Sequence, residues 1–410
     1  MHQLHALALV LTCFLLSACG DGLTTSTGDT SGGADGGVTE TSVDPCEGSS
    51  IFTSGQGASF VIGQTNFTSS TDPTAPTASN VLEPYGTVSY FDDILYIPDP
   101  AQSRILGFST LPASSGASAD LAIGQDDLVS DTPATSATGL KYPTRIQKYD
   151  GKYYVLDSGN HRLLRYDSAP NTTGAQASAV VVGDPNLGSA GSGCSDTQLS
   201  EPTDFLIVAG KLYIVGGSQN RVLGWNTVPT SAGTPADFVL GKSDMADCST
   251  PSTPSATASN LRNPKGIASD GTKLLVADTI HSRILIWNSL PNTNGAAADV
   301  VIGQNSMTTS TSNSGGISDI SLYEPFALTV HEGKLYVADF SNHRVLIWDA
   351  IPTSNSAAAS TVIGQAGFTS RTGAISQTAI KNPKGVFVCA NQLYVTQGED
   401  ANRISVFEGL

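Results

Sequence analysis

A segment of about eleven residues recurs six times along this chain, and no other feature of the sequence constrains the fold as strongly. Its copies span residues 98–108, 156–166, 215–225, 277–287, 338–348 and 399–407. Each copy contains an arginine and, four positions later, an aromatic residue. The arginines are Arg104, Arg162, Arg221, Arg283, Arg344 and Arg403, at successive separations of 58, 59, 62, 61 and 59 residues. A constant period of this length indicates six copies of one structural unit.

Three more landmarks keep this period and predict what the unit contains. A proline stands before the first predicted strand of each unit: Pro84, Pro143, Pro202, Pro264, Pro325 and Pro383. A run such as LYVAD (335–339) precedes the arginine, and a run that ends near a glycine, such as TVIGQ (361–365), follows it. Short β-branched runs between turn residues are typical of strands. We therefore expect each unit to be an antiparallel sheet of four strands, A to D in chain order.

The order of the landmarks predicts how the six sheets assemble. Sheets of this size bury both faces when they pack radially, as in a β-propeller. One D-type run, residues 58–64, stands before the first proline, whereas the last copy has runs A, B and C and ends at Leu410. The predicted fold is therefore all-β, a six-bladed β-propeller over residues 51–410, closed by the N-terminal strand pairing into the last blade.

The pattern of Pro-x-Gly, LYVAD, NHR, hydrophobic run and aromatic residue resembles the NHL repeat family. The resemblance covers about residues 58–410 and is sharpest at 264–288 and 325–349. It implies an NHL-like six-bladed propeller, although the D-to-A connections are longer than those repeats usually have. Two copies depart from the pattern, because Gly216 replaces the aspartate of the third and the sixth has an extra residue near Gln397. We expect those two hairpins to be less regular.

The motif itself is predicted to be structural. An aspartate stands five residues before the arginine in four copies: Asp99, Asp157, Asp278 and Asp339. A hairpin between strands B and C brings the two side chains together, and exposed pairs of this kind contribute about 0–1 kcal/mol each. His161 and His343 occupy a position that holds serine or asparagine in the other copies, so the repeat does not require a histidine there.

The N-terminus predicts export and attachment to lipid. Residues 1–18 contain an apolar run that is short for a membrane span and typical of a signal peptide. The sequence Leu-Ser-Ala-Cys at 16–19 resembles a bacterial lipobox, which implies cleavage before Cys19 and its lipidation, and Gly20 implies sorting to the outer membrane of a Gram-negative cell. The alternative is an ordinary signal peptide with a chance cysteine, since no lysine or arginine precedes the apolar run. Residues 19–50 have few apolar side chains and are predicted to be a flexible tether.

Four cysteines remain beyond the predicted lipidation site: Cys46, Cys194, Cys248 and Cys389. An even number in an exported protein predicts disulfides. Cys194 and Cys248 fall in consecutive D-to-A connections, on the same face of adjacent blades, and are predicted to pair. Cys46 and Cys389 follow by elimination, and their bond would tie the N-terminal segment to the last blade.

The charge and the loops indicate what the protein binds. A formal net charge of −16 disfavours nucleic acid as a partner, because proteins that bind it carry basic patches. In propellers the D–A and B–C loops share the face around the channel mouth, and long loops on a rigid scaffold commonly bind ligands. The first residues of strand A are candidates for binding at that mouth: Tyr85, Thr144, Thr203, Lys265, Phe326 and Lys384. The first hypothesis is therefore a monomeric, membrane-attached module that binds an unidentified protein, peptide or glycan and has no catalytic residues.

The alternative hypothesis is an enzyme. Similarity to NHL-like propellers such as the peptidylamidoglycolate lyases implies a lyase or hydrolase that holds a metal with channel histidines. The mature chain has four, His161, His281, His331 and His343, of which three are placed in B–C hairpins and His331 near an A–B turn on the opposite face. They are poorly placed to converge on one metal, and we expect no cofactor. A calcium site from loop carboxylates would use Asp126, Asp127 and Asp131, which lack the spacing of an EF-hand.

Overall fold

Six antiparallel sheets of four strands follow one another along the part of the chain that the computed structural model describes, residues 46–48, 50–186, 192–250 and 256–410. These residues belong to one compact unit, Asp44–Leu410. The predicted signal peptide and Cys19 lie outside the described residues. In these ranges no helix has the length and apolar character needed to cross a membrane.

Each sheet is a blade, numbered one to six in chain order. Blade one contains β2 (Ser89–Phe91), β3 (Ile94–Asp99), β4 (Arg104–Phe108) and β5 (Leu121–Ile123). Blade two contains β6 (Pro143–Tyr149), β7 (Lys152–Asp157), β8 (Arg162–Tyr166) and β9 (Ala179–Val182). Blade three contains β10 (Asp204–Val208), β11 (Lys211–Gly216), β12 (Arg221–Trp225) and β13 (Phe238–Leu240).

The other three blades repeat this order. Blade four contains β14 (Ile267–Ser269), β15 (Leu274–Asp278), β16 (Arg283–Trp287) and β17 (Val300–Ile302). Blade five contains β18 (Pro325–His331), β19 (Lys334–Asp339), β20 (Arg344–Trp348) and β21 (Thr361–Ile363). Blade six contains β22 (Pro383–Cys389), β23 (Gln392–Gln397), β24 (Arg403–Glu408) and the early strand β1 (Phe60–Ile62). Short 3-10 turns lie between strands B and C of blades one, two, five and six: η1 (Pro100–Gln102), η2 (Ser158–Asn160), η3 (Phe340–Asn342) and η4 (Glu399–Ala401).

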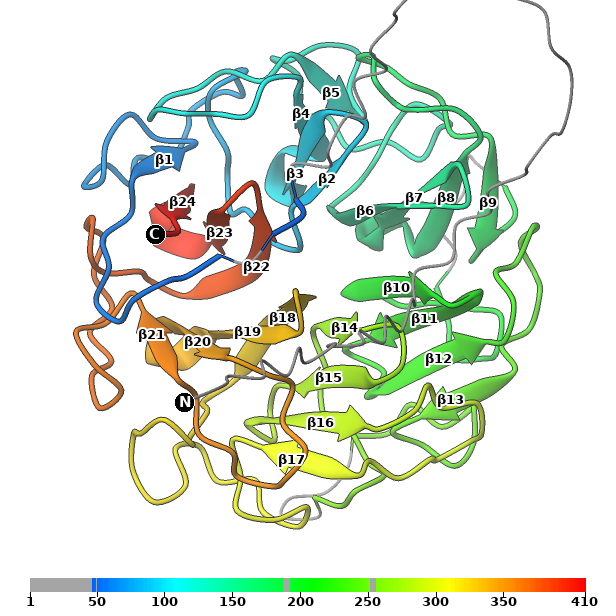
Figure 1. Cartoon of the computed structure of the whole chain (residues 1–410). Helices are drawn as coiled ribbons and strands as arrows, with labels where there is room; N and C mark the ends of the chain where they lie inside the picture. The colour runs from blue at the N-terminus through cyan, green and yellow to red at the C-terminus, as the bar shows by residue number, and fades with distance from the viewer. Residues whose placement is uncertain (1–45, 49, 187–191, 251–255) are drawn as a thin grey trace, which may run out of the picture. The chain divides into compact units, whose positions relative to one another are not determined.

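The ring closes between strands from the two ends of the described chain. β1 pairs antiparallel with β24, with Phe60 opposite Val406 and Ile62 opposite Ile404. In Figure 1 the blue β1 lies beside the red β24, and the first strand of every blade faces the centre of the ring. The sheets and this closure confirm the predicted all-β, six-bladed propeller.

Six clusters of buried apolar side chains lie between neighbouring blades. Each cluster draws its residues from two consecutive sheets. The cluster at the seam joins Phe60 and Ile62 of β1 to Leu95 and Leu106 of blade one. Because each blade shares both faces with its neighbours, the burial that stabilises it depends on the repeat on either side.

The aromatic residue of the motif ends strand C and holds the connection that follows. Trp225, Trp287 and Trp348 are buried, and each indole N–H donates to the backbone carbonyl nine residues later, at 3.1, 3.0 and 3.0 Å. A buried tryptophan usually finds such a partner for its N–H. In these three blades the motif therefore fixes the C–D connection as well as the strand.

Both predicted disulfides are present. Cys194 pairs with Cys248, which joins the D–A connections that precede blades three and four. Cys46 pairs with Cys389 in β22 of blade six. Ser50 is buried as well. Cys46 and Ser50, which belong to the segment 19–50 that the sequence predicted to be a tether, therefore contact the propeller.

The first strands of the blades approach one another closely around the central axis. A Cβ atom at Gly86 would lie 1.8 Å from the carbonyl oxygen of Thr144 in the next blade, and one at Gly385 would lie 2.1 Å from the carbonyl oxygen of Gly86. The glycine of Pro-x-Gly is therefore required by close packing of backbones. Arg145 and Asp204, on the first strands of blades two and three, form an ion pair of 2.9 Å.

Candidate functional site

The motif arginines fasten the long D–A connections that form one face of the propeller. The Arg344 Nη2 group donates to the carbonyls of Ser318 and Ser321, at 3.0 and 2.8 Å, in the connection before blade five. Its Nη1 group donates to the carbonyl of Phe368 in the connection after that blade. Arg104 and Arg283 bind the equivalent carbonyls. These three arginines thus each tie two successive loops to the strand between them.

A buried carboxylate completes this arrangement in four blades. The arginine Nε–H donates to the aspartate that ends strand B, at 2.7 to 2.9 Å. The second carboxylate oxygen accepts a backbone N–H. The donor is the residue two positions before the strand A proline of the same blade, as Tyr323 donates to Asp339 at 2.8 Å. All eight side chains have 0% exposure. The expectation of exposed, weak pairs is therefore wrong, because the D–A connections cover them.

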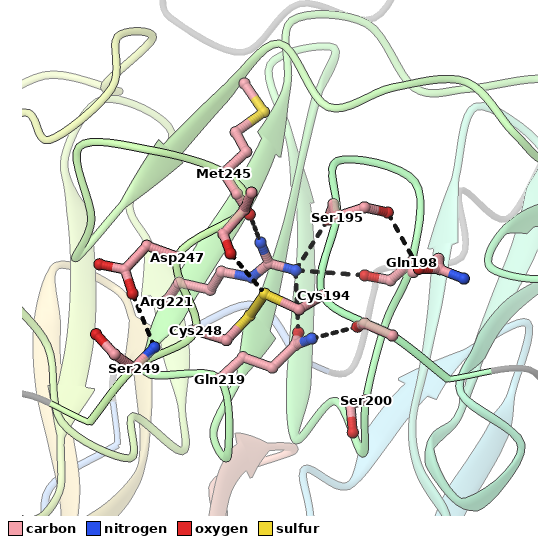
Figure 2. Close-up of a disulfide and its surroundings, with 12 residues drawn as sticks. Cys194, Ser195, Gln198, Ser200, Gln219, Arg221, Met245, Asp247, Cys248 and Ser249 are labelled. Carbon is pink, nitrogen blue, oxygen red and sulfur yellow. Dashed lines mark hydrogen bonds between the residues drawn. A yellow bond between two sulfur atoms is a disulfide. The ribbon is translucent and has the colours of Figure 1, made fainter.

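Blade three keeps the arginine without the aspartate. Gly216 stands opposite Arg221 in the ladder, and the Arg221 Nε has no hydrogen-bond partner among the described residues. The Nη2 group instead reaches the Gln219 side chain at 3.3 Å and the carbonyl of Ser195 at 2.9 Å. Burial lowers the pKa of Arg221 to about 10. Figure 2 shows this guanidinium beside the disulfide of Cys194.

Blade six differs in a related way. Gln397 takes the place of the aspartate opposite Arg403, and its Oε1 accepts the N–H of Lys381 at 2.8 Å. Burial lowers the pKa of Arg403 to about 10. The ladders β11–β12 and β23–β24 are continuous to their last pairs. The strands of these two hairpins are therefore regular. The blade six turn does depart from the others, because it has one more residue between the paired ends and Glu399 has a positive φ of 53°.

The position before the arginine links five of the six blades to the next. His161 Nδ1 accepts the N–H of Glu201 at 2.9 Å, and Asn220 Oδ1 accepts the N–H of Asn263 at 2.9 Å. The same bond recurs between Ser282 and Glu324, His343 and Asn382, and Asn402 and Glu83. Each donor is the residue before a strand A proline. Histidine, asparagine and serine therefore share one role as acceptor, and we name these contacts the blade latches.

A pocket of about 810 Å³ opens at the channel mouth beside blades two, three and four. Its rim is formed by residues that directly precede the strand A prolines: Lys141, Tyr142, Glu201, Arg262 and Asn263. Its deeper part contains Tyr85, Thr203 and Lys265. The latches and the buried aspartates hold the backbone of these rim residues, so the pocket stands on a fixed frame.

The structure brings most of the predicted mouth residues together. Tyr85, Thr203 and Lys265 line the pocket, and they also line a small adjoining void with Phe326 and Lys384. The Tyr85 ring meets the Phe326 ring edge-on, with centroids 5.1 Å apart. The remaining candidate, Thr144, is buried and lines neither cavity.

The pocket is cationic and contains neutral phenols. Burial lowers the pKa of Lys265, and the carboxylate of Glu201 acts in the opposite direction. Burial raises the pKa of Tyr85 and Tyr142, so both hydroxyl groups stay protonated at neutral pH. The lysines on the other side of the mouth have partners instead: Lys381 lies 2.6 Å from Asp400 and Lys384 lies 3.2 Å from Glu399.

The four histidines do not gather at the mouth. His281 is fully buried against Asp278 at 2.9 Å, and His331 lies 3.2 Å from the carbonyl of Gly48. His161 and His343 serve as latch acceptors in different blades. In the described ranges no group of three or more histidine, cysteine, aspartate or glutamate residues is arranged to hold a metal ion, and this includes the stretch of Asp126, Asp127 and Asp131.

Sequence reasoning missed the rim of the pocket. It selected the residue after each strand A proline, whereas Lys141, Tyr142, Glu201 and Arg262 stand one or two positions before it. A signal was present, because the position two before the proline is basic in three of the six repeats: Lys141, Arg262 and Lys381. Its meaning depends on which of these residues has an acidic partner, and for Lys381 that partner is Asp400, in the B–C turn of the same repeat.

The fold and the pocket define a six-bladed β-propeller with a ligand-sized cavity at one channel mouth. No protein-family model matches the chain, and no curated protein is significantly similar to it. The NHL resemblance therefore rests on the repeat motif alone.

Solved structures resemble the chain at low identity. The nidogen/laminin complex matches with a TM-score of 0.38 and 16% identity, over 68% of this chain and 83% of that chain. The PQQ-bound form of aldose sugar dehydrogenase from Streptomyces coelicolor matches with a TM-score of 0.42 and 15% identity, over 82% and 96%. The computationally designed Ika8 protein matches with a TM-score of 0.39 and 11% identity, over 80% and 96%. Matches at this level transfer no function.

Proposed function

We propose that this protein is a binding module of the cell envelope whose ligand occupies the pocket at the channel mouth. The observation that supports the proposal is the pocket itself, because its volume of about 810 Å³ falls within the range of known ligand sites. Its lining combines charged groups, amides, hydroxyl groups and two tyrosine rings. A cavity of this size on a rigid ring is suited to binding a small ligand, and the proposal needs no cofactor.

The supporting framework favours binding through a preformed site. The rim backbone is held by buried aspartates and by the latches, so little ordering remains to oppose binding. Thermal shift with a panel of neutral, anionic and cationic saccharides and peptides tests the proposal. We expect at least one compound to raise the melting temperature of the purified protein, and Tyr142→Ala to abolish that shift. A panel that gives no shift at millimolar concentration contradicts the proposal.

The cellular setting belongs to the same proposal. Lipid at Cys19 would hold a monomer in the outer membrane of a Gram-negative cell, with residues 51–410 free to meet a protein, peptide or glycan and without a role for nucleic acid. Metabolic labelling with an alkyne-tagged fatty acid tests this. We expect label on the wild-type chain and none on Cys19→Ser, which should also fractionate as a soluble protein. Labelling that persists in Cys19→Ser rejects the site.

The enzyme alternative makes a different prediction. A metal-dependent lyase or hydrolase related to NHL-like propellers would copurify with a stoichiometric metal ion and turn over substrate. Elemental analysis of the protein, followed by a hydrolase and lyase screen, separates the two hypotheses. Stoichiometric metal together with turnover that is lost in Lys265→Met would replace binding with catalysis at the pocket.

A further inference from the structure

The pocket is a positively charged site on a negatively charged protein. The formal net charge of the chain is −16. The charged side chains that line the pocket, with histidine neutral, are nevertheless Lys141, Arg262 and Lys265 against the single carboxylate of Glu201. Among the described residues these three cations make no ion pair within 4 Å, whereas Lys384 across the mouth is paired. Unpaired cations gathered in one cavity favour an anionic occupant.

Two of the cations are held in equivalent places on either side of blade three. Lys141 and Arg262 each lie two residues before a strand A proline, and their backbone N–H groups donate to buried Asp157 and Asp278, at 2.7 and 2.6 Å. Blade three, between them, has Ser200 at this place. One occupant above blade three can therefore meet an ammonium group and a guanidinium group, and the guanidinium is suited to a carboxylate.

The third cation lies deeper. Lys265 is half-buried, and its Nζ lies 5.8 Å from the centroid of the Phe326 ring. The burial that lowers its pKa also removes part of its hydration. An anionic group at this depth would restore that lost stabilisation. Lys265 therefore favours a ligand whose anionic group lies deep in the pocket over one whose anionic group stays at the rim.

The neutral lining limits the size and character of the ligand. The half-buried Tyr142 ring, the Asn220 and Asn263 amides and the Thr203 hydroxyl surround the cations. The overall negative charge repels long polyanions, so the anion must be small. We infer that the pocket binds a carboxylate-bearing molecule of about disaccharide size with one or two negative charges. This inference rests on the proposed binding function and specifies its ligand class.

Matched acid and neutral probes test the inference. Digalacturonate is compared with its dimethyl ester, and N-acetyl-Glu-Glu-amide with N-acetyl-Gln-Gln-amide, by titration calorimetry at low salt. We expect one acid of the two pairs to bind at least tenfold more tightly than its neutral counterpart, and added NaCl to weaken it. The sugar pair and the peptide pair separate the two sources of carboxylate. Equal affinity for acid and neutral forms, or no binding of either acid, overturns the inference.

Variants of the lining give a signature that a structural role would not produce. Lys141→Gln and Arg262→Gln should each lower the affinity for the acid about tenfold and leave the melting temperature of the free protein unchanged. Glu201→Gln should raise the affinity for the acid severalfold, because the substitution removes the opposing negative charge. The latch bond is kept, since residue 201 donates it from its backbone N–H. Lys273→Gln, in the β14–β15 hairpin and outside the pocket lining, is the matched control and should have no effect. If Glu201→Gln weakens binding as the lysine variant does, charge is not the determinant and the inference fails.

Failure of the inference is distinguishable from failure of binding at this site. One outcome is a neutral or cationic compound in the thermal-shift panel that raises the melting temperature of the wild-type protein and not that of Tyr142→Ala. In that case the pocket does bind a ligand, and only the carboxylate class is wrong. If neither the panel nor the four probes bind, the proposed function falls together with the inference.

Discussion

Blades three and six differ from the other four in the same two respects, and the difference shows what the repeat must preserve. Blades one, two, four and five bury an aspartate against the motif arginine. Blade three has Gly216 and blade six has Gln397 at that place. These two blades are also the ones with a disulfide, through Cys194 and through Cys389.

In blade three Arg221 still binds carbonyls of both neighbouring connections, and the Cys194–Cys248 bond joins those same connections. In blade six, among the described residues, Arg403 binds carbonyls in the connection that follows the blade and none in the connection before it, and the disulfide joins β22 to the segment before β1. The arginine is therefore kept in all six blades, whereas the carboxylate is replaceable.

The largest effect is expected from breaking the buried pair in a blade that has no disulfide. Asp339→Ala should lower the free energy of unfolding by about 3–5 kcal/mol, because it leaves Arg344 buried without its counter-charge. Urea denaturation measures this. Asp349→Ala is the control in the same blade, since its side chain is 71% exposed, and it should change stability by less than about 0.5 kcal/mol.

The same variant also distinguishes a structural role of Asp339 from a role in ligand binding. Asp339 does not line the pocket, so the folded variant should bind any pocket ligand with unchanged affinity. A loss of affinity at an unchanged melting temperature would contradict the structural role assigned to the motif.

The second effect comes from removing the covalent bond in blade three. Cys194→Ser with Cys248→Ser opens a bond between residues 54 apart in sequence, and cross-links of this length stabilise by about 2–4 kcal/mol. We expect a lower melting temperature and a smaller further decrease on adding dithiothreitol, because only the Cys46–Cys389 bond remains to be reduced. A double variant as stable as the wild-type protein would show that the disulfide does not substitute for the missing pair.

A smaller, stabilising effect should follow from making blade three like blade two. Gly216→Asp with Gln219→Asn recreates the Asp-x-x-Asn arrangement and offers the unpartnered Arg221 Nε a carboxylate. Shortening residue 219 is needed because a Cβ at Gly216 would lie 2.9 Å from the Gln219 Oε1. We expect a gain of about 1–2 kcal/mol in chemical denaturation.

A neutral counterpart sharpens this test. Gly216→Asn with Gln219→Asn has nearly the same shape without the charge and should gain less. If both double variants destabilise equally, the glycine is required by the backbone and the comparison between the blades fails.

The smallest effect concerns the latches that use histidine. Burial lowers the pKa of His161 and His343 below the unfolded value of about 6.5, so the unfolded chain binds more protons as the pH falls. The latch contribution is therefore complete above about pH 6.5 and is lost progressively below it, by less than about 1 kcal/mol per histidine.

The chain itself supplies the control for this pH dependence. Blades three and six use Asn220 and Asn402 as acceptors at the same position. His161→Asn with His343→Asn should keep the latches and flatten the fall in melting temperature between pH 7 and 5. An unchanged pH profile would assign that fall to other groups.

The fold could be predicted because its information is periodic and local. The spacing of the arginines and prolines defined six sheets, and the unpaired early run defined β1 as the closing strand, which pairs at Phe60 with Val406. The disulfides followed from the placement of cysteines on that frame. The burial of Asp339 and Arg344 did not follow, since it arises from loops about 24 residues away on both sides that cover the hairpin.

The site was only half predictable for a similar reason. The position directly after the strand A proline correctly identified Lys265 and Tyr85 as lining residues, because strand A faces the axis in every blade. The asymmetry of the mouth was missed. It arises because the B–C turn of the sixth repeat carries Glu399 and Asp400, which pair with Lys384 and Lys381. The turns of the other five repeats carry no acid at these positions. The sequence shows where the acids stand, but only the side-chain geometry shows that they reach the lysines.

The bond between Cys46 and Cys389 has a mechanical consequence. It stands between the beginning of the chain and β1, the strand that closes the ring. Any pull on the chain before residue 46 therefore passes through a covalent bond into β22 before it reaches the hydrogen bonds between β1 and β24. While the Cys46–Cys389 bond is oxidised, a force applied at the N-terminus does not load the hydrogen bonds between β1 and β24. Reduction of that bond would transfer the force to them.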